Sequence, residues 1–297
     1  MSEKIVHELS NGVTLVGDFF DSSSSKGIVL FPGFTEHRSS LNSLAQKLNS
    51  EYKTWTFDIN SQGESTGKWD LSEMSHSAYL LINELKKHHG LKKVGAVGNS
   101  VGSMSVGLVA SQPDSNIDCL CLNTTPAGLQ DVFPNYALNL LNIIPQSVFR
   151  FATIAYDKFE GLRNENYKQK TQSQFKKDGV YQKHAQFGAL KVHDVKEFVR
   201  LIRTAPRLDE YIQNITQPIL FVYGGEDRAV MNIKNNQLPK EIVNLYERTK
   251  SKDKRLLVVS GADHSLNEKT KIDDCFNQDQ KYQSVKQETL NHFLEYL

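Results

Sequence analysis

Short apolar segments without polar alternation recur along the chain, and each ends at or just before glycine, proline, aspartate or asparagine. They cover residues 27–31, 54–58, 94–97, 118–123, 219–223 and 255–260. Strands that are apolar throughout are buried on both faces, as in a parallel sheet covered by crossover helices. Helical stretches fit between most of them, at residues 41–50, 71–87, 103–111 and 282–297. The alternation predicts a three-layer α/β fold with a mostly parallel sheet.

Two regions depart from this alternation. Residues 5–20 are expected to form an antiparallel hairpin with Asn11-Gly12 at its turn. Residues 124–214 offer no convincing strand but helical stretches at 137–144, 146–159, 167–186 and 195–204. We therefore predict one core, residues 1–123 and 215–297, interrupted by a helical cap, residues 124–214.

The chain has 297 residues, a net charge of +1 and 23% charged residues, which is typical of a globular protein. This charge gives no basic surface for nucleic acid, so we expect no such partner. Three cysteines cannot form a disulfide framework. The sequence offers no signal peptide and no apolar run of about 18 residues, so we expect a cytoplasmic protein without stable membrane insertion.

The segment Gly98-Asn99-Ser100-Val101-Gly102 joins a predicted strand directly to a predicted helix. A nucleophile elbow needs this setting, because only small flanking residues allow the strained turn that exposes the serine. The pattern G-x-S-x-G also occurs by chance, and Ser100 could instead cap the helix of an ordinary glycine-rich turn.

Two later strand ends carry the other residues that a serine nucleophile needs. Gly224-Gly225-Glu226-Asp227 and Gly261-Ala262-Asp263-His264 each follow a predicted strand. Loops at the carboxyl ends of parallel strands converge on one crevice, so Ser100, Asp227 and His264 can meet there. We expect His264 to act as the base and Asp227 to orient it, with Glu226 and Asp263 as adjacent alternatives to Asp227.

The tetrahedral intermediate of such a reaction needs N–H donors for its oxyanion. In this architecture one donor is the residue after the nucleophile, Val101, and the other comes from an early loop. The early loop is Phe31-Pro32-Gly33-Phe34-Thr35-Glu36-His37, so Phe34 N–H is the expected second donor. An ordinary Pro-Gly turn is the alternative interpretation of this loop.

Together these segments resemble the α/β-hydrolase superfamily, and within it capped esterases similar to monoacylglycerol lipases and feruloyl or cinnamoyl esterases. The resemblance spans nearly the whole chain and includes residues 58–67, which resemble a D-x-R-G-H-G-x-S-x-G loop. Its Arg, first Gly and His are Asn60, Ser61 and Gln62 here. Pro32 replaces the His of a His-Gly pair, and Ser103 replaces a second Gly after the elbow.

The resemblance implies that residues 124–214 cover the nucleophile and supply an apolar wall for the substrate. Candidate substrate-binding residues are Phe133, Tyr136, Leu140, Leu141 and Phe149, with Phe151 beside them. Taken singly, such side chains more often belong to the core of a cap than to a substrate wall.

We therefore predict a serine hydrolase that cleaves a small or medium carboxylic ester through an acyl-enzyme. Thioesterases and acyltransferases use the same machinery and stay open as alternatives. A ligand-binding protein without turnover is the alternative suggested by the off-pattern residues. We expect a small-molecule ester substrate, no cofactor and no metal, since no group of residues has ligand spacing. An NAD-binding domain is excluded, because no G-x-G-x-x-G follows the first parallel strand.

Overall fold

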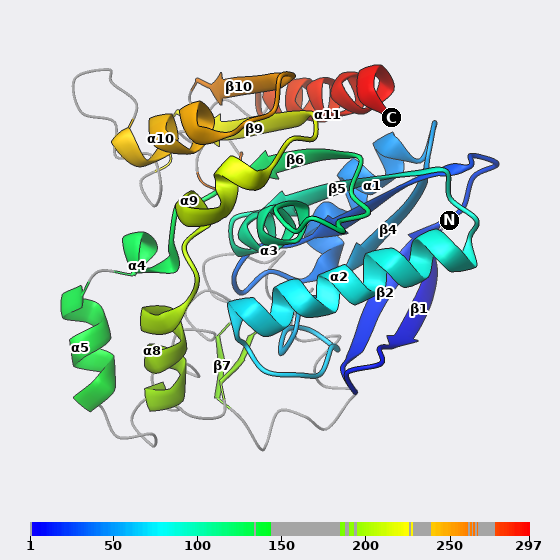
Figure 1. Cartoon of the computed structure of the whole chain (residues 1–297). Coiled ribbons are helices and arrows are strands. Elements are labelled where there is room, and N and C mark those ends of the chain that lie inside the picture. Colours follow the sequence, from blue (N-terminus) through cyan, green and yellow to red (C-terminus); the bar gives the residue numbers. More distant parts are fainter. Residues whose placement is uncertain are drawn as a thin grey trace.

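The computed structural model describes residues 2–133, 135–143, 185–187, 190–192, 195–225, 227, 239–260, 262, 264, 266 and 277–297. An eight-stranded sheet runs through these residues in the order β1-β2-β4-β3-β5-β6-β9-β10 (Figure 1). Its strands are β1 (Glu3–Glu8), β2 (Thr14–Phe20), β3 (Lys26–Phe31), β4 (Lys53–Phe57), β5 (Lys93–Asn99), β6 (Cys119–Asn123), β9 (Ile219–Gly224) and β10 (Lys254–Val259). Strands β4, β3, β5, β6, β9 and β10 pair in parallel, which confirms the expected α/β class.

The expected amino-terminal hairpin is also present. Strand β1 pairs antiparallel to β2, and β2 pairs antiparallel to β4. Gly12 lies in the hairpin turn with φ +81°, a conformation that glycine reaches without steric cost. The side-chain oxygen of Asn11 accepts a hydrogen bond from Val13 N at 3.2 Å. The Asn11-Gly12 pair therefore supplies the turn that the sequence predicted.

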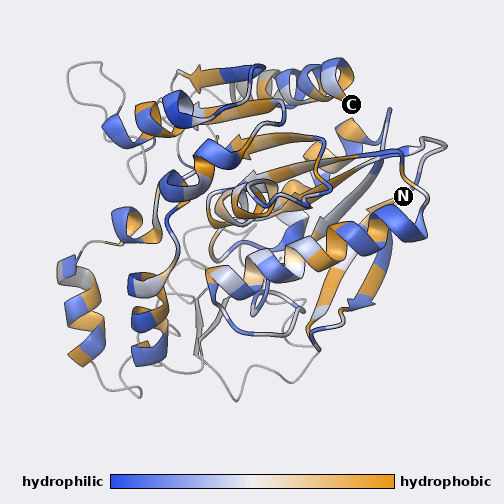
Figure 2. Cartoon of the chain, in the orientation of Figure 1, coloured by the Kyte–Doolittle hydropathy of each residue, from blue (hydrophilic) through white to orange (hydrophobic). Residues whose placement is uncertain are grey.

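Helices cover both faces of the sheet. One face carries α2 (Leu71–His88), α3 (Val101–Ala110) and α10 (Lys240–Arg248), and the other carries α1 (Asn42–Leu48) and α11 (Asn277–Tyr296). The side-chain oxygen of Asp70 accepts from the N–H groups of Ser72 and Glu73, which explains where α2 begins. In Figure 2, α2 alternates between polar and apolar residues because only one side of it meets the sheet.

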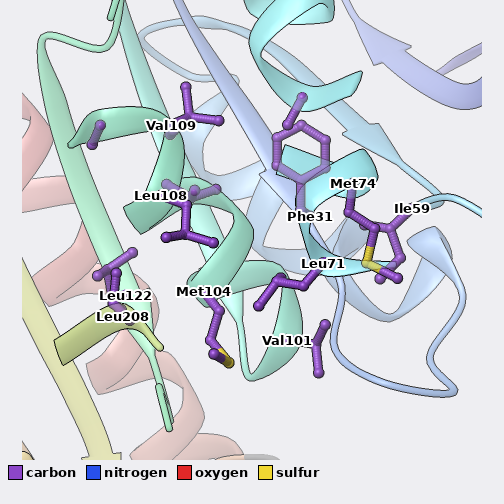
Figure 3. Packing of buried hydrophobic residues seen from close by; sticks show 14 of the residues in the cluster. Phe31, Ile59, Leu71, Met74, Val101, Met104, Leu108, Val109, Leu122 and Leu208 are labelled. Atoms are coloured by element: carbon purple, nitrogen blue, oxygen red, sulfur yellow. The ribbon is translucent and has the colours of Figure 1, made fainter. Parts of the chain in front are cut away.

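The core consists of two clusters separated by the sheet. In β3, Val29 and Phe31 belong to the cluster under α2 and α3, whereas Ile28 and Leu30 belong to the cluster under α1 and α11. This alternation follows from the two-residue period of a strand. Figure 3 shows the first cluster, where side chains of α3 pack beside residues of the neighbouring strands and loops. Helix α3 is buried along its whole length.

The chain between β6 and β9 contains α4 (Leu129–Val132), α5 (Asn135–Ile143), α8 (Val195–Thr204), α9 (Leu208–Tyr211) and the 3-10 helix η3 (Ile212–Asn214). It also contains β7 (Ala185–Phe187) and β8 (Leu190–Val192), which pair antiparallel. The prediction that this segment holds no strand was therefore wrong. Apolar residues alternate on both sides of Gly188-Ala189 in the sequence, a pattern that favours a hairpin over the helix expected at 167–186. The rest of that helix, like the one expected at 146–159, lies outside the described residues.

None of the helices that the structure describes is both long and apolar enough to cross a membrane. The division into a core and a cap at residues 124 and 214 stays a prediction.

Candidate active site

Ser100 lies at a sharp turn between β5 and α3. Its φ is +48° and its ψ is −113°, a conformation that a non-glycine residue adopts only when its surroundings impose it. A Cβ at Gly98 would lie 2.3 Å from Ser103 Cα, and one at Gly102 would lie 2.4 Å from the Pro32 carbonyl oxygen. Both glycines of the motif are thus required by close backbone contacts. The strand, turn and helix expected here are present.

The Ser100 hydroxyl faces His264 rather than capping the helix. It makes no capping hydrogen bond with α3, although Ser100 occupies the N-cap position. Ser100 Oγ lies 3.0 Å from His264 Nε2, and His264 Nδ1 lies 2.8 Å from Asp227 Oδ2. Ser100 and Asp227 are buried, and the His264 side chain is 33% exposed. The structure thus brings these three residues together in a linear array.

Backbone contacts between β9 and β10 hold the two loops that carry Asp227 and His264. Gly225 N donates to the Val259 carbonyl oxygen at 2.8 Å, and Ala262 N donates to the same oxygen at 3.2 Å. The strands end side by side, with Val259 opposite Gly224. The alternatives Glu226 and Asp263 lie outside the described residues. The ends of two adjacent parallel strands therefore place the Asp227 carboxylate and the His264 imidazole side by side, as expected for loops that follow parallel strands.

The loop after β3 lies against the nucleophile. A Cβ at Gly33 would lie 3.2 Å from Ser100 Cβ and 3.1 Å from Glu36 Oε2. Gly33 N donates to Glu36 Oε2 at 2.7 Å, and Glu36 N donates to the Gly33 carbonyl oxygen at 3.2 Å. This turn contains Phe34, the expected oxyanion donor. Val101, the other expected donor, is the first residue of α3, so its N–H has no partner within the helix.

Burial of the Glu36 carboxylate raises its pKa above the usual range. Donors from Gly33 N and from the side chains of Ser40 and Asn99 oppose this shift, as does the nearby His264. Glu36 therefore links the early loop to the residue that precedes the nucleophile.

A buried ion pair between Arg38 and Asp58 also holds the loop after β3. Arg38 Nη1 lies 2.6 Å from Asp58 Oδ2, and Arg38 N donates to Asp58 Oδ1 at 2.7 Å. Burial alone would lower the pKa of Arg38, but the carboxylates of Asp58 and Asp18 outweigh it and raise the pKa. Asp58 also accepts from Glu64 N at 3.2 Å. Both Arg38 and Asp58 are buried, so this pair fixes the early loop to the loop 58–67.

Two of the off-pattern residues make contacts at the site. The Gln62 amide is hydrogen-bonded to the loop after β3, at Thr35 N and at the Gly33 carbonyl oxygen. Ser103 Oγ donates to the Ser100 carbonyl oxygen and accepts from Thr125 Oγ1 at 2.7 Å. The departures that marked these positions in the sequence thus coincide with contacts to the loop and to the elbow.

Three aromatic side chains lie around Phe34. The centroid of the Phe34 ring lies 5.4 Å from that of Phe133, 5.3 Å from that of Trp69 and 5.9 Å from that of Phe198. Phe133 follows α4 and Phe198 lies on α8, so the segment between β6 and β9 contacts the loop beside Ser100. Phe133 was predicted to lie at the site, whereas Trp69 and Phe198 were not. The spacing of apolar residues over 195–204 indicates only that Phe198 faces a buried surface.

The other predicted substrate-binding residues have different surroundings. Leu140 is 57% exposed on α5, and Leu141 packs partly buried against the first core cluster. The side chain of Tyr136 and all of Phe149 and Phe151 lie outside what the structure describes. Their contact with a substrate stays a prediction.

The model of one protein family, described as serine aminopeptidase S33, matches residues 22–270 of the chain. The chain belongs to this family. It is a hydrolase of the α/β-hydrolase type, as the eight-stranded sheet and the strand, turn and helix around Ser100 also indicate. No curated protein sequence matches this hydrolase.

Solved structures share the fold of this hydrolase at low sequence identity. An esterase of Pyrococcus furiosus is 16% identical with a TM-score of 0.64, and the match covers 100% of this chain and 91% of that one. A hydrolase from Pseudomonas aeruginosa is 12% identical with a TM-score of 0.65, covering 98% of each chain. Est1E from Butyrivibrio proteoclasticus, solved with ferulic acid, is 17% identical with a TM-score of 0.60, covering 98% and 99%.

Proposed function

We propose that this hydrolase cleaves small or medium carboxylic esters through an acyl-enzyme on Ser100. The observation that carries the proposal is the array from Ser100 Oγ to His264 Nε2 at 3.0 Å and from His264 Nδ1 to Asp227 Oδ2 at 2.8 Å. A serine hydroxyl becomes a competent nucleophile when an imidazole takes its proton during attack. A carboxylate on the far nitrogen holds that imidazole in the right tautomer and stabilises the imidazolium.

In this mechanism Ser100 Oγ attacks the ester carbonyl carbon while His264 accepts its proton. The N–H groups of Phe34 and Val101 stabilise the oxyanion of the tetrahedral intermediate. His264 then donates the proton to the leaving alcohol. Water, deprotonated by His264, releases the acid from Ser100 in the second half of the reaction.

The surroundings of the nucleophile favour an apolar ester over a peptide with a free amino terminus. An α-ammonium group needs an anionic partner. Among the carboxylates that the structure describes around the nucleophile, that of Asp227 is bonded to His264, and that of Glu36 to Gly33 N. The cluster of aromatic side chains formed by Phe34, Phe133 and Phe198 suits an ester with an apolar acyl or alcohol moiety. One structural neighbour, found in three crystal forms, is named as an esterase, which agrees with this choice.

We also propose that residues 124–214 act as the cap of the site, over a core of residues 1–123 and 215–297. The contacts of Phe133 and Phe198 with Phe34 support this division, because they join both ends of the segment to the loop beside Ser100.

A fluorophosphonate probe tests the nucleophile. The wild-type protein is expected to be labelled at one site per chain and the Ser100→Ala variant not at all. Ser105→Ala is the matched control, since Ser105 is buried on the same helix but lies outside the segment 98–102. A folded wild-type protein that stays unlabelled would overturn the proposal and favour a ligand-binding protein without turnover.

A substrate panel tests the bond that is cleaved. Para-nitrophenyl esters of graded chain length, the matching thioesters and an aminoacyl para-nitroanilide are compared by kcat/KM. We expect the esters to be the best substrates. A preference for thioesters, for the anilide, or for transfer to an added alcohol would replace the esterase with a thioesterase, an aminopeptidase or an acyltransferase.

A further inference from the structure

The side chain of Gln62 reaches from the loop after β4 into the loop after β3. Gln62 Oε1 accepts a hydrogen bond from Thr35 N at 2.6 Å. Gln62 Nε2 donates to the Gly33 carbonyl oxygen at 3.0 Å and lies 3.4 Å from the Glu36 carbonyl oxygen. Gln62 is fully buried. One amide thus contacts three backbone groups of the turn that carries Phe34.

The first contact selects the type of this turn. Glu36 N donates to the Gly33 carbonyl oxygen, and Thr35 has φ +64° at the third position, the pattern of a type II turn. A β-branched threonine disfavours this conformation, so on its own the sequence Gly33 to Glu36 favours a type I turn. The two turns differ by a flip of the peptide between Phe34 and Thr35. In type I, the Phe34 carbonyl oxygen would face Gln62 Oε1, and two acceptors would repel each other.

The second contact orients Phe34 N–H. The Gly33 carbonyl group and Phe34 N–H belong to one planar trans peptide, so they point in opposite directions from it. Gln62 Nε2 fixes the direction of the carbonyl oxygen and therefore also the direction of the N–H. The Gly33 end of this peptide lies against Ser100.

We propose that Gln62 is a positioning residue for the oxyanion hole, acting through the backbone of residues 33–35. The inference rests on the proposed function, in which Phe34 N–H stabilises the tetrahedral intermediate. Gln62 touches no reacting atom. Its effect falls on kcat, because the oxyanion forms only in the transition state and substrate binding does not depend on it.

The test compares Gln62→Met with Asn60→Ala in steady-state ester hydrolysis. Gln62→Met keeps the side-chain length and removes all three contacts, so kcat is expected to fall about 10- to 100-fold with KM within about twofold. Asn60 is buried in the same loop but bonds to Ser77 Oγ at 3.1 Å, so Asn60→Ala is expected to retain the wild-type kcat. Unchanged kcat in a folded Gln62→Met protein overturns the inference. If that variant does not fold, the milder Gln62→Asn keeps the amide, but its side chain is one methylene shorter and cannot reach both Thr35 N and the Gly33 carbonyl oxygen. A wild-type kcat for Gln62→Asn overturns the inference equally.

A second substitution separates turn selection from a general loss of packing. Glycine adopts positive φ without cost, so adding Thr35→Gly to Gln62→Met is expected to raise the melting temperature of the single variant without restoring kcat, because the turn type does not flip the peptide that carries Phe34 N–H. A double variant no more stable than Gln62→Met would refute turn selection. Fluorophosphonate labelling distinguishes failure of the proposed function from failure of this inference. Wild-type protein that is not labelled overturns the proposed function and this inference together. Labelled, active wild type beside an equally active Gln62→Met overturns the inference alone.

Discussion

The loops at the carboxyl ends of the parallel strands, here called the carboxyl edge, differ from the loops at their amino ends, the amino edge, in which residues have positive φ. At the carboxyl edge, five non-glycine residues of the described chain have φ between +47° and +64°, and each follows a different parallel strand: Thr35, Ser61, Ser100, Thr124 and Leu266. At the amino edge, among the described loops, Gly90 alone has positive φ, and it is a glycine. Strain of about 1–3 kcal/mol per residue persists only where the surroundings impose it.

Those surroundings are visible as hydrogen bonds to the strained residues. Ser100 N donates to the Asn123 carbonyl oxygen at 2.9 Å, and Thr124 N donates to the Val222 carbonyl oxygen at 2.7 Å. Thr35 N donates to the Gln62 side chain at 2.6 Å. Three of the five strained residues are thus held by the neighbouring element across the sheet. The carboxyl edge, where the proposed active site lies, thus holds backbone strain, whereas the amino edge closes its described turns with little strain.

The largest effect on kcat is expected from replacing Asp227, the buried carboxylate of the carboxyl edge. Asp227→Asn replaces the acceptor of His264 Nδ1 with an amide that favours the wrong imidazole tautomer. We expect kcat to fall about 10³- to 10⁴-fold with a melting temperature near that of the wild type. Kinetics and circular dichroism measure the two quantities. If kcat stays within about tenfold of the wild type, Asp227 is not the residue that orients His264.

Gly98→Ala is expected to affect both activity and stability. The new Cβ would lie 2.3 Å from Ser103 Cα, so β5 and α3 must move apart. We expect a loss of about 1–3 kcal/mol in the free energy of unfolding. Displacement of Ser100 should lower kcat about 100-fold. Urea unfolding and ester hydrolysis measure the two effects. Wild-type behaviour would show that the elbow tolerates a side chain at this position.

His292, on α11 behind the sheet, is expected to affect stability but not catalysis. It is buried, its Nε2 lies 3.2 Å from the Leu120 carbonyl oxygen, and burial lowers its pKa from 6.5 to about 4. Between these values the unfolded chain binds more protons than the folded chain. Stability therefore falls as the pH falls from about 6.5 to 4, by about 3 kcal/mol from this residue.

His292→Gln tests this dependence, because glutamine can donate to Leu120 and does not titrate. Urea unfolding of both proteins is measured at pH 7, 6, 5 and 4. The wild type is expected to lose stability more steeply with acid than the variant. Parallel curves for the two proteins would contradict the assignment.

The smallest effect is expected at the amino edge. Gly90 has φ +59°, and a Cβ there would meet no atom within 4 Å. Gly90→Ala should therefore cost about 1 kcal/mol from backbone strain alone, or about 2–4 °C in melting temperature, with kcat unchanged. Calorimetry and ester hydrolysis provide the check. A marked fall in kcat would break the distinction between the two edges.

Much of the site could be predicted from the sequence because its signals are local. The elbow needs Gly98, Ser100 and Gly102 within five residues, and the array needs Asp227 and His264 at strand ends. Gln62 was visible only as a departure from a family pattern, and its partner loop could not be read from spacing. Trp69 and Phe198 gave no signal that they contact Phe34, because aromatic residues in amphipathic segments are commonly core residues.

The amino-acid sequence alone indicates the alternation of strands and helices, the glycine-flanked serine and the order of serine, aspartate and histidine along the chain. These depend on periodicity and on steric needs within a few residues. That Gln62 and Glu36 hold the loop beside Ser100 is known only from the folded chain. Such contacts depend on which loops the strand order places side by side. The spacing of residues along the chain does not reveal how close two such loops lie.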